Sequence, residues 1–482
     1  MEKKKIKTAL ISVFNKEGLT PVTELLKKNG VKIISTGGTA EFIRKLGADV
    51  TEVESLTNFP SVFGGRVKTL HPAIFGGILN RRDNPEDQKS KYAHKIEDID
   101  LVIVDLYPFE EKPEIETIDI GGVSLIRAAA KNYEDVVVIS SREQYKDLKI
   151  ETTLEERKKL AGEAFARTSS YDFAIREYFQ SIPLRYGENP HQNASFVGDL
   201  TESFSQLHGK ELSYNNLLDT EAVIAVINDF KEPAFAIVKH MNTCGLAVRP
   251  EGKLLEAYQA AYAADPVSAF GGILAANREI GEDVAKLIRE QKLFVEVVIA
   301  PGFSEEALKI LEQKKDCRIL LWHEPQLPKK QIRSSFTGML VQDRDMHVET
   351  EKDLKVVTTR APTEREKEDL LVAAVAVKHL KSNAIALVKD KTLISMGCGQ
   401  TARVDALKQA IEKAKNFGLL LEGAVMASEA FFPFPDCVEI AGGAGISAVI
   451  QPGGSKNDQA SIDMANKLGM AMATTGYRHF KH

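Results

Sequence analysis

The chain has 482 residues, more than a single hydrophobic core usually supports, so we expect two or three domains. Hydrophobic residues make up 43% and charged residues 27%, a balance typical of globular proteins that work in water. The formal net charge of -5 argues against a general nucleic-acid binder, because such proteins carry a basic stripe or patch. Any anion-binding capacity must therefore be local.

The cysteines and the N-terminus narrow the class of protein further. Four cysteines lie far apart in the sequence: Cys244, Cys317, Cys398 and Cys437. Their spacing predicts neither a zinc site nor a disulfide framework. The apolar run at residues 9–14 is too short for a signal peptide, and no apolar stretch is long enough to span a membrane. We therefore expect a cytoplasmic protein with no bound metal and no membrane partner.

The first 150 residues or so alternate short β-branched runs with helical patterns. Strands are predicted at residues 8–14, 31–35, 101–106 and 136–140, and helices at 19–28, 40–46 and 124–131. This alternation implies right-handed βαβ units and a mostly parallel sheet, so the fold class is α/β. Ligands of such sheets bind outside the carboxyl ends of the strands.

A charged helical stretch at residues 154–180 is followed by a break at residues 183–192. We place a domain boundary there, which gives domains 1–182 and 183–482, the second split into two subdomains near 341–363. Further elements are predicted in the second domain: strands at 234–239, 272–276, 295–300 and within 384–396, and helices at 254–264, 365–380 and 403–414. Its two blocks share a loose plan, in which residues 239–245 would correspond to residues 397–403, so an internal duplication is a hypothesis.

Residues 64–72, Gly-Gly-Arg-Val-Lys-Thr-Leu-His-Pro, combine glycines and cations with no acidic residue. Glycines let the backbone approach a ligand closely, and Arg66 and Lys68 would point the same way in an extended segment. Together they suit a phosphate and a reacting group. A solvated surface turn is the alternative for this segment on its own.

A second glycine-rich segment, Ser35 to Thr39, ends a predicted strand and opens a predicted helix. Its hydroxyls and free amides suit a phosphate, although a plain N-cap turn has the same composition. Ser12 and Lys16 follow the first strand and would lie at the same edge of the sheet. Further titratable groups lie at element boundaries: Tyr107, Asp119 and Lys131. Converging there, they would offer proton transfer and oxyanion stabilisation.

In the second domain, Lys239 and His240 leave a buried strand together. A lone histidine is more often structural, but a neighbouring cation favours the neutral, basic imidazole. Asn383 adds an amide that suits an oxyanion. Gly397 to Ala402 fits the loose dinucleotide-binding pattern, so an NAD-dependent oxidoreductase is one alternative function. Gln400 and Arg403 beside that segment instead suggest a polar ligand contact rather than close helix-to-strand packing.

Taken in chain order, these segments resemble the bifunctional purine-biosynthesis family that joins AICAR transformylase to IMP cyclohydrolase. The matching motifs are Ser-Thr-Gly-Gly-Thr, Gly-Gly-Arg-Val-Lys-Thr-Leu-His-Pro, Ile-Asp-Ile-Gly-Gly, Leu-Arg-Tyr-Gly-Glu-Asn-Pro-His-Gln, Asp-Pro-Val-Ser-Ala-Phe-Gly-Gly and Phe-Phe-Pro-Phe-Pro-Asp. The resemblance implies an N-terminal domain like methylglyoxal synthase, which closes FAICAR to IMP. It also implies a C-terminal duplicated cytidine-deaminase-like region, which formylates AICAR from 10-formyltetrahydrofolate. Neither a metal nor a nicotinamide cofactor is implied.

The resemblance also implies roles for individual residues. Substrate binding in the cyclohydrolase would use Ser12, Lys16, Ser35, Thr36, Gly37, Gly38, Thr39 and Arg66. Its chemistry would use Lys68, Tyr107, Asp119 and Lys131. In the transformylase, His240 would be the base, Lys239 would orient it, and Asn383 would donate to the oxyanion. Substrate binding there would use Arg185, Tyr186, Gly271, Glu296, Arg403, Phe431 and Arg478. The family forms homodimers with the transformylase sites between subunits.

Three positions depart from the family pattern. Asp105 stands where members usually have Asn, Thr243 replaces a common Pro, and Glu296 occupies a position that can be Asp. The extra negative charge of Asp105 near an anion site leaves a second alternative, a nucleotide-binding regulator that kept the fold and lost one activity.

Overall fold

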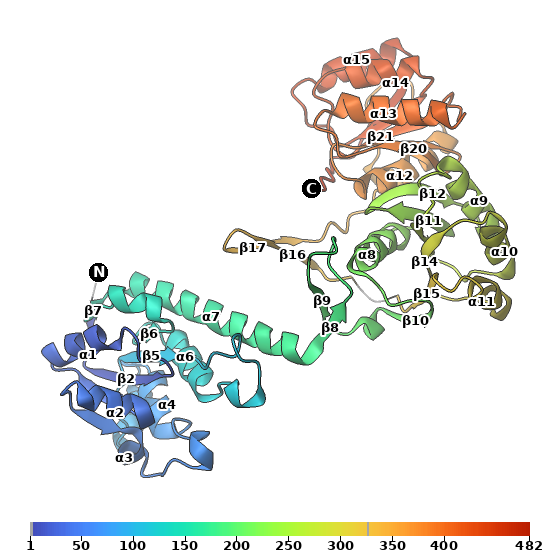
Figure 1. Cartoon of the computed structure of the whole chain (residues 1–482). Helices are drawn as coiled ribbons and strands as arrows, with labels where there is room; N and C mark the ends of the chain where they lie inside the picture. The colour runs from blue at the N-terminus through green and yellow to red at the C-terminus, as the bar shows by residue number, and fades with distance from the viewer. Residues whose placement is uncertain (1–2, 325–326) are drawn as a thin grey trace. The chain divides into compact units, whose positions relative to one another are not determined.

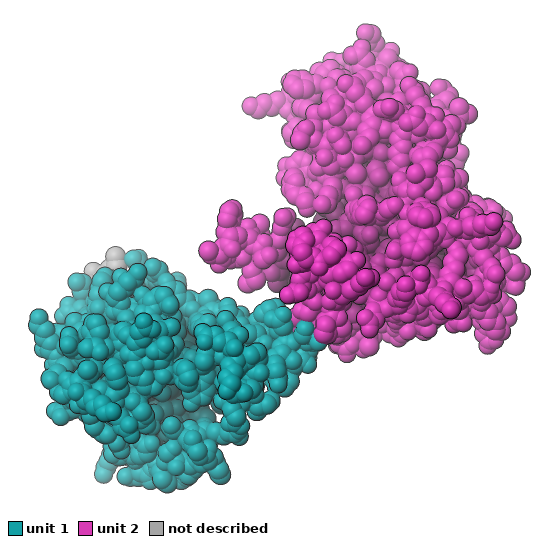
Figure 2. All heavy atoms as spheres, in the orientation of Figure 1, with its two compact units in different colours: residues 1–181 teal, residues 182–482 magenta. Residues whose placement is uncertain are grey.

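The structure, a computed structural model, describes residues 3–324 and 327–482. The chain forms two compact units, residues 1–181 and 182–482, which Figure 2 colours separately. No helix in the described part of the chain combines the length and apolar character that a membrane crossing requires.

Unit 1, in which Figure 1 labels β2, β5 and β6, is built on a five-stranded parallel sheet in the order β4-β3-β2-β5-β6. Its strands are β2 (Thr8–Val13), β3 (Lys32–Ser35), β4 (Val50–Glu52), β5 (Leu101–Asp105) and β6 (Val137–Ile139). The chain runs outward from β2 through β3 to β4 and then returns to β5. The strand order therefore reverses between β2 and β5, which is where sheets of this kind bind ligands.

Helices cover both faces of the unit 1 sheet, so the buried middle parts of its central strands, residues 9–11 and 101–104, are apolar. The helices are α1 (Leu19–Lys28), α2 (Gly37–Lys45), α3 (Val53–Thr57), α4 (Pro72–Leu79), α5 (Pro85–Ala93), α6 (Gly121–Lys131) and α7 (Leu154–Gln180). The predicted strands and helices of this unit are confirmed, with α2 and α6 each beginning three residues earlier than expected. A short pair, β1 (Lys4–Lys5) and β7 (Glu151–Thr152), lies beside the main sheet.

Unit 2 contains one twelve-stranded sheet, in the order β10-β15-β14-β13-β11-β12-β20-β19-β21-β22-β23-β18. In chain order these strands are β10 (Phe204–His208), β11 (Ala234–Lys239), β12 (Asn242–Val248), β13 (Gly272–Ala276), β14 (Val295–Ala300), β15 (Arg318–Trp322), β18 (Lys355–Val356), β19 (Ile385–Lys389), β20 (Thr392–Gly397), β21 (Val425–Ser428), β22 (Ala448–Gln451) and β23 (Ala471–Thr474). The two halves of the sheet meet where β12 pairs with β20.

The same order of elements occurs twice in unit 2. Each half has a helix, a tight hairpin and then three helix-strand steps. The helices of the first half are α8 (Tyr214–Asn228), α9 (Leu254–Ala264), α10 (Glu282–Glu290) and α11 (Glu305–Leu311), and those of the second are α12 (Glu364–Lys378), α13 (Arg403–Asn416), α14 (Asp436–Gly443) and α15 (Asp458–Lys467). α8 and α12 share one apolar core on one face of the sheet, and the other helices form two cores on the opposite face.

The repeat has a different register from the expected one. Lys239 pairs with Asn242 across the first hairpin, and Lys389 pairs with Thr392 across the second. Both hairpins also carry a register shift between the two residues that directly precede the lysine at the turn, Ile237 and Val238 in the first and Leu387 and Val388 in the second. Residues 239–242 thus correspond to 389–392, and the expected match with residues 397–403 is wrong. That expectation compared polar composition, whereas the repeat is defined by strand pairing.

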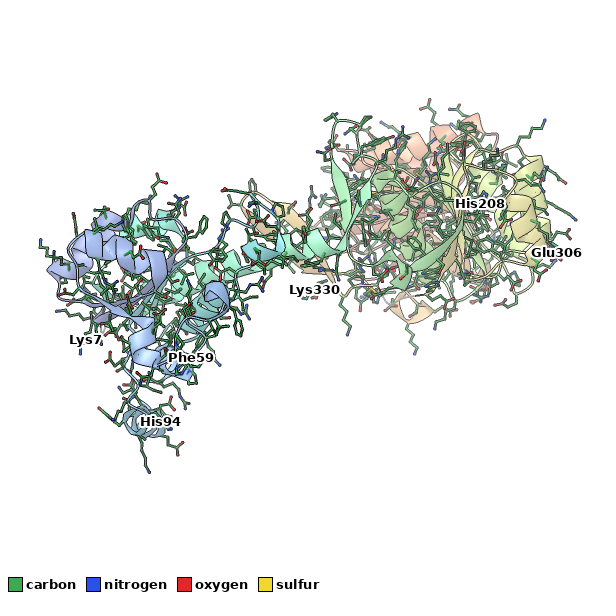
Figure 3. The ribbon with its side chains drawn as sticks, turned by 60° about the horizontal axis from the view of Figure 1, so that its bottom comes forward. Lys7, Phe59, His94, His208, Glu306 and Lys330 are labelled. Carbon is green, nitrogen blue, oxygen red and sulfur yellow. The ribbon has the colours of Figure 1, made fainter. Side chains whose placement is uncertain are left out.

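Two smaller hairpins complete unit 2: β8 (Ser181–Leu184) with β9 (Ala194–Val197), and β16 (Lys330–Ser335) with β17 (Gly338–Asp343). Lys330, the first residue of β16, lies at the surface (Figure 3). The polar region expected at 341–363 contains the end of β17 and the edge strand β18. It is fastened to the C-terminus by His479, whose ring contacts Asp345 Oδ2 at 2.5 Å and Glu349 Oε1 at 2.7 Å.

Candidate active sites

In unit 1 the amides at the start of α2 are available to an anion. Thr36 is the N-cap residue of α2, but it makes no side-chain hydrogen bond to the first turn and donates to Glu54 Oε1 at 3.1 Å. Gly37 has a φ of 53°, a left-handed conformation that glycine adopts without strain. The first N–H groups of α2, including those of Gly37 and Gly38, therefore do not donate to the side chain of the N-cap residue. They are suited to donate to a phosphate.

The hydroxyls of this segment have a different task from the expected one. Ser35 Oγ donates to Ile11 O at 2.7 Å, and Thr39 Oγ1 donates to Val13 O at 3.0 Å. Both side chains are buried. These hydrogen bonds attach β3 and the start of α2 to β2, so in this structure the two hydroxyls support the α2 N-terminus from the protein interior.

Lys16 lies at the same edge, after the half-buried Ser12 at the end of β2. Its Nζ donates to Val13 O at 2.8 Å and to Phe14 O at 2.7 Å. Burial lowers the pKa of Lys16, Asp105 acts to raise it, and Lys68 lowers it further. Lys16 and Lys68 thus form one local concentration of positive charge near the α2 amides.

The loop that carries Lys68 is compact rather than extended. Val62 and Val67 form an isolated antiparallel bridge, and Gly64 and Gly65 have φ values of 64° and 92°. Lys68 lies directly over Gly65, where a Cβ would come within 2.7 Å of Nζ. The same Nζ lies 3.4 Å from the position a Cβ would take on Gly37. The loop therefore directs Lys68 at the start of α2.

Arg66 does not point with Lys68 as an extended segment would require. It forms an ion pair with Glu116, and both side chains are more than half exposed. His71 of the same motif is the N-cap of α4, where its Nδ1 accepts from Ala73 N at 3.1 Å. The expected parallel orientation of the two cations is wrong because the glycines fold the loop back.

Asp119 and Tyr107 form the acid-base part of this edge. Burial raises the pKa of Asp119, which hydrogen bonds from the backbone of Gly122 and Tyr107 oppose. Its Oδ1 accepts from Gly122 N at 2.6 Å. Burial and the charge of Asp119 also raise the pKa of Tyr107. The two groups are thus close enough to influence each other's protonation.

Lys131 is not part of this group. It is the last residue of α6, ten residues after Gly121, and a helix rises about 1.5 Å per residue. About 15 Å therefore separates it from the Asp119 end of the helix. The expectation that Lys131 meets Asp119 at the sheet edge is not met in unit 1, because α6 carries it back toward the opposite edge.

In unit 2, Lys239 and His240 lie at the turn between β11 and β12. Lys239 Nζ donates to Phe270 O at 2.7 Å, beside Gly271, whose φ is 73°. His240 is exposed, and its backbone N–H donates to Asp219 Oδ2 at 3.3 Å. Asn242 Nδ2 donates to His240 O at 2.8 Å.

Asn242 also joins this turn to the second half of the unit. Its Oδ1 accepts from Lys381 N at 3.5 Å and from Cys398 Sγ at 3.4 Å. The turn with His240 and the segment with Asn383 thus lie side by side. Asn242 belongs to the segment that begins at Lys239 and His240, but no sequence pattern marks Asp219, because it acts through tertiary hydrogen bonds.

Asn383 has no free donor in this arrangement. Its Nδ2 donates to Gln400 O at 3.0 Å and to Thr401 O at 3.1 Å, and its Oδ1 accepts from Arg403 Nη2 at 2.9 Å. An amide has two hydrogens, and both are used. In this structure neither amide hydrogen of Asn383 is left over for the expected donation to an oxyanion, which stays a prediction.

Arg403 is likewise engaged within the unit. Its Nη2 pairs with Glu429 Oε1 at 2.8 Å, and its Nη1 donates to Phe431 O at 3.1 Å. The side chain is 8% exposed and that of Glu429 is fully buried. The charge of Arg403 is thus compensated within the unit, and its expected role in substrate binding stays a prediction.

The loop Gly397 to Ala402 is occupied by its own neighbours. Gly399 N donates to Lys381 O at 2.7 Å, and Gln400 and Thr401 accept from Asn383. A Cβ on Gly397 would overlap Ala406 O of α13, so this glycine does allow close helix-to-strand packing, contrary to expectation. The amides of Cys398, Gly399 and Gln400 are thus already engaged within the chain.

The remaining expected contacts are spread around this region. Glu296 Oε2 pairs with Arg318 Nη1 at 2.7 Å, and the guanidinium of Arg478 lies 4.4 Å from the centre of the Phe480 ring. Ser382 N donates to Lys481 O at 2.9 Å, which places the C-terminal segment beside Asn383.

Arg185 and Tyr186 are held near α8. The guanidinium of Arg185 lies 5.3 Å from the Tyr186 ring centre, and Glu188 O of the same loop accepts from Asn215 Nδ2 at 3.3 Å. Asn215 and Asp219 are four residues apart and share one face of α8. The loop with Arg185 and the turn with His240 thus attach to the same helix face. Among the described residues, no group of three or more His, Cys, Asp or Glu side chains is arranged to hold a metal ion.

Comparison with known proteins decides the family. The model described as AICARFT/IMPCHase bienzyme matches residues 129–413, and the one described as MGS-like domain matches residues 18–137. The chain belongs to the AICARFT/IMPCHase bienzyme family. It is therefore an enzyme of purine biosynthesis with a transformylase and a cyclohydrolase part, and the expected methylglyoxal-synthase-like fold of its N-terminal region is confirmed.

Full-length relatives of the AICARFT/IMPCHase bienzyme family agree. The bifunctional purine biosynthesis protein PurH of Bacteroides thetaiotaomicron is 55% identical, with 100% of both chains covered. The proteins of that name from Acetivibrio thermocellus and Rhodospirillum rubrum are 48% and 47% identical, with 99% of this chain and 100% and 99% of those proteins covered. A solved structure titled "Crystal structure of ForH" is 30% identical, with 36% of this chain and 96% of that chain covered and a TM-score of 0.33.

Proposed function

We propose that unit 2 transfers a formyl group from 10-formyltetrahydrofolate to AICAR, and that unit 1 closes the resulting FAICAR to IMP. The observation that carries the second step is the placement of Lys68, whose Nζ lies over Gly65 and beside Gly37 at the open start of α2. A cation there can serve a reacting oxygen of a substrate whose phosphate sits on the α2 amides.

For ring closure, the carboxamide nitrogen attacks the formyl carbon, a C–N bond forms, and the formyl oxygen leaves as water. Lys68 would stabilise the oxyanion of the tetrahedral intermediate. Asp119 would accept the proton of the attacking nitrogen, a task that suits a carboxyl group whose pKa burial has raised. Tyr107, close to Asp119, would pass a proton to the leaving oxygen. Lys16 would add positive charge at the phosphate.

For formyl transfer, the amine of AICAR is a weak nucleophile, so its proton must leave as it attacks the formyl carbon. A C–N bond to the amine forms, the bond between the formyl carbon and the folate nitrogen breaks, and the folate nitrogen leaves with a proton. The exposed ring of His240 would take that proton. Lys239 uses one ammonium hydrogen on Phe270 O, and its other hydrogens would serve the developing oxyanion in place of Asn383. Phe270 and Phe294, with ring centres 5.5 Å apart, offer an apolar surface for a planar substrate beside Lys239.

We further propose that the protein works as a cytoplasmic homodimer. Arg185, Arg478 and Phe431 are at least partly exposed in the single chain, which would allow a substrate to contact residues of two subunits. Each half of unit 2 would be one copy of a cytidine-deaminase-like unit, in keeping with the repeated order of elements.

Two substitutions in the full chain test the assignment of one reaction to each unit. Lys68→Ala should abolish closure of FAICAR and leave formylation of AICAR unchanged, while His240→Ala should do the reverse. Lys45→Ala, which removes an exposed lysine at the far end of α2, is the matched control for Lys68 and should affect neither reaction. Loss of both activities in a folded Lys68→Ala protein would refute separate sites, and absence of one activity in the unaltered chain would favour the regulator.

A further inference from the structure

The turn that carries His240 has an internal twin in the second half of unit 2. His240 and Met241 have φ values of 52° and 60°, and the equivalent Asp390 and Lys391 have values of 51° and 55°. All four are non-glycine residues in the left-handed region, which costs of order 1–3 kcal/mol per residue unless the surroundings hold it. Both turns therefore need stabilising hydrogen bonds from residues outside the turn.

An aspartate on the preceding helix supplies these hydrogen bonds in both halves. Asp219 on α8 accepts from His240 N at 3.3 Å and from Met241 N at 2.6 Å. Asp369 on α12 accepts from Asp390 N at 3.1 Å and from Lys391 N at 2.6 Å. In each case one carboxylate satisfies two consecutive backbone donors of the turn. Hydrogen bonds from an amide to a charged acceptor are among the strong ones in proteins.

The surroundings of the two turns differ. In the second turn, Arg249 Nη1 donates to Asp390 O at 2.9 Å, and Lys391 Nζ pairs with Glu232 Oε1 at 3.3 Å. An arginine and ion pairs thus hold that turn, although the side chain of Asp390 is exposed. In the first turn His240 is exposed beside Lys239 and the Asn383 segment. Both turns are therefore open to solvent and share one local geometry, but only the first carries a histidine.

We infer that Asp219 is a positioning residue for formyl transfer, because its carboxylate fixes the left-handed turn that aims His240 at the substrate. This inference rests on the proposed function of unit 2. Asp219 touches no reacting atom and acts only through the backbone of the turn. Misplacing a catalytic group by about 1 Å can lower the rate about a hundredfold, so a small displacement of this turn should strongly lower the rate of formyl transfer.

Asp369 provides a matched control, because it has the same hydrogen bonds at a turn without a candidate catalytic residue. Asp219→Ala should lower kcat for formyl transfer by about a hundredfold with little change in the KM for AICAR. Asp369→Ala should lower the melting temperature by a similar amount and leave kcat for transfer unchanged. Both variants should close FAICAR at the wild-type rate, which confirms that unit 1 is folded.

A double-mutant cycle with His240→Ala separates positioning from general stability. If Asp219 acts through His240, adding Asp219→Ala to His240→Ala should cause no further loss of transfer. Losses that multiply, or equal losses in Asp219→Ala and Asp369→Ala, would overturn the inference while the proposed function stands. Wild-type transfer by His240→Ala would overturn the proposed base and the inference together.

Discussion

The ammonium group of Lys68 lies so close to Gly65 that a Cβ at that position would stand 2.7 Å from Nζ and overlap the side-chain carbon next to it. Gly65→Ala should therefore displace Lys68 and reduce closure of FAICAR by about a hundredfold, the cost typical of losing one oxyanion donor. Formylation of AICAR by the same protein should not change. Steady-state assays of both reactions measure this.

Gly64→Ala is the matched control for that substitution. Gly64 has a similar left-handed φ of 64°, but nothing lies within 4 Å of its added Cβ. The Gly64→Ala protein should therefore be somewhat less stable than the wild type and should keep most of its rate of FAICAR closure. Equal loss of rate in both alanine variants would show that backbone strain, and not the position of Lys68, limits the reaction.

Asp105 and Lys16 lie together at the phosphate end of unit 1. Asp105 Oδ2 accepts from Asn15 N at 3.0 Å, so this carboxylate fastens the loop after β2, and it also acts to raise the pKa of Lys16. Asp105→Asn keeps an acceptor for Asn15 and removes a negative charge near the substrate phosphate. The KM for FAICAR should fall by about two- to fivefold at low salt, with a smaller change at high salt. A rise in KM would mean that the charge of Asp105 supports the site through Lys16.

The ion pair of Arg403 and Glu429 is buried. Glu429→Ala would leave the guanidinium uncompensated and should lower the free energy of unfolding of unit 2 by about 3–5 kcal/mol. Formyl transfer should fall as well, because a displaced Arg403 would no longer hold Asn383 in the segment beside the turn of His240. Denaturant titration and the transfer assay measure the two effects.

A double replacement, Arg403→Met with Glu429→Met, tests the cause of that loss. Two apolar side chains of similar size leave no buried charge, so the double variant should be more stable than Glu429→Ala. Transfer should remain low, since Asn383 would still lack its arginine partner. If the double variant is the less stable protein, packing rather than charge explains the loss.

His479 makes the stability of unit 2 depend on pH. Burial alone would lower its pKa, but the hydrogen bonds to Asp345 and Glu349 outweigh burial and raise the pKa to about 9. An unfolded histidine has a pKa near 6.5, so this contribution is complete below about pH 6.5 and disappears as the pH rises through about 9. The shift corresponds to about 3 kcal/mol.

The measurement for His479 is the free energy of unfolding between pH 6 and pH 9.5. His479→Gln should be less stable than the wild type at pH 6, and the difference should shrink toward pH 9.5. A constant difference across that range would show that folding does not raise the pKa of this histidine.

Much of the secondary structure could be predicted because it depends on local patterns. Residues 19–28, 154–180 and 234–239 form the predicted helices and strand with the predicted bounds. Their apolar spacing is a property of a few consecutive residues. The cation cluster of unit 1 was also predictable in part, since Lys16 and Lys68 stand in recognisable segments.

The partners of those residues could not be predicted in the same way. Lys131 lies in the same motif-rich region as Asp119, but the direction of α6 removes it from the edge. Asn383 was expected to donate to a substrate, but its neighbours at Gln400 and Thr401 take both hydrogens. Composition shows which groups are present, but it does not show which partners they form hydrogen bonds with.

The sequence by itself determined the fold class, the likeness to a two-reaction enzyme family and the residue types available at each sheet edge. The tertiary structure alone decided that Lys68 lies over Gly65 and that Asp219 holds the turn of His240. The physical reason is the separation along the chain of the residues that interact. Helical and strand periodicity is set by neighbours along the chain, whereas each of these contacts depends on a loop whose conformation is fixed by packing against distant residues. A hydrogen bond such as that between Asn242 and Lys381 exists only once two sheet halves have met.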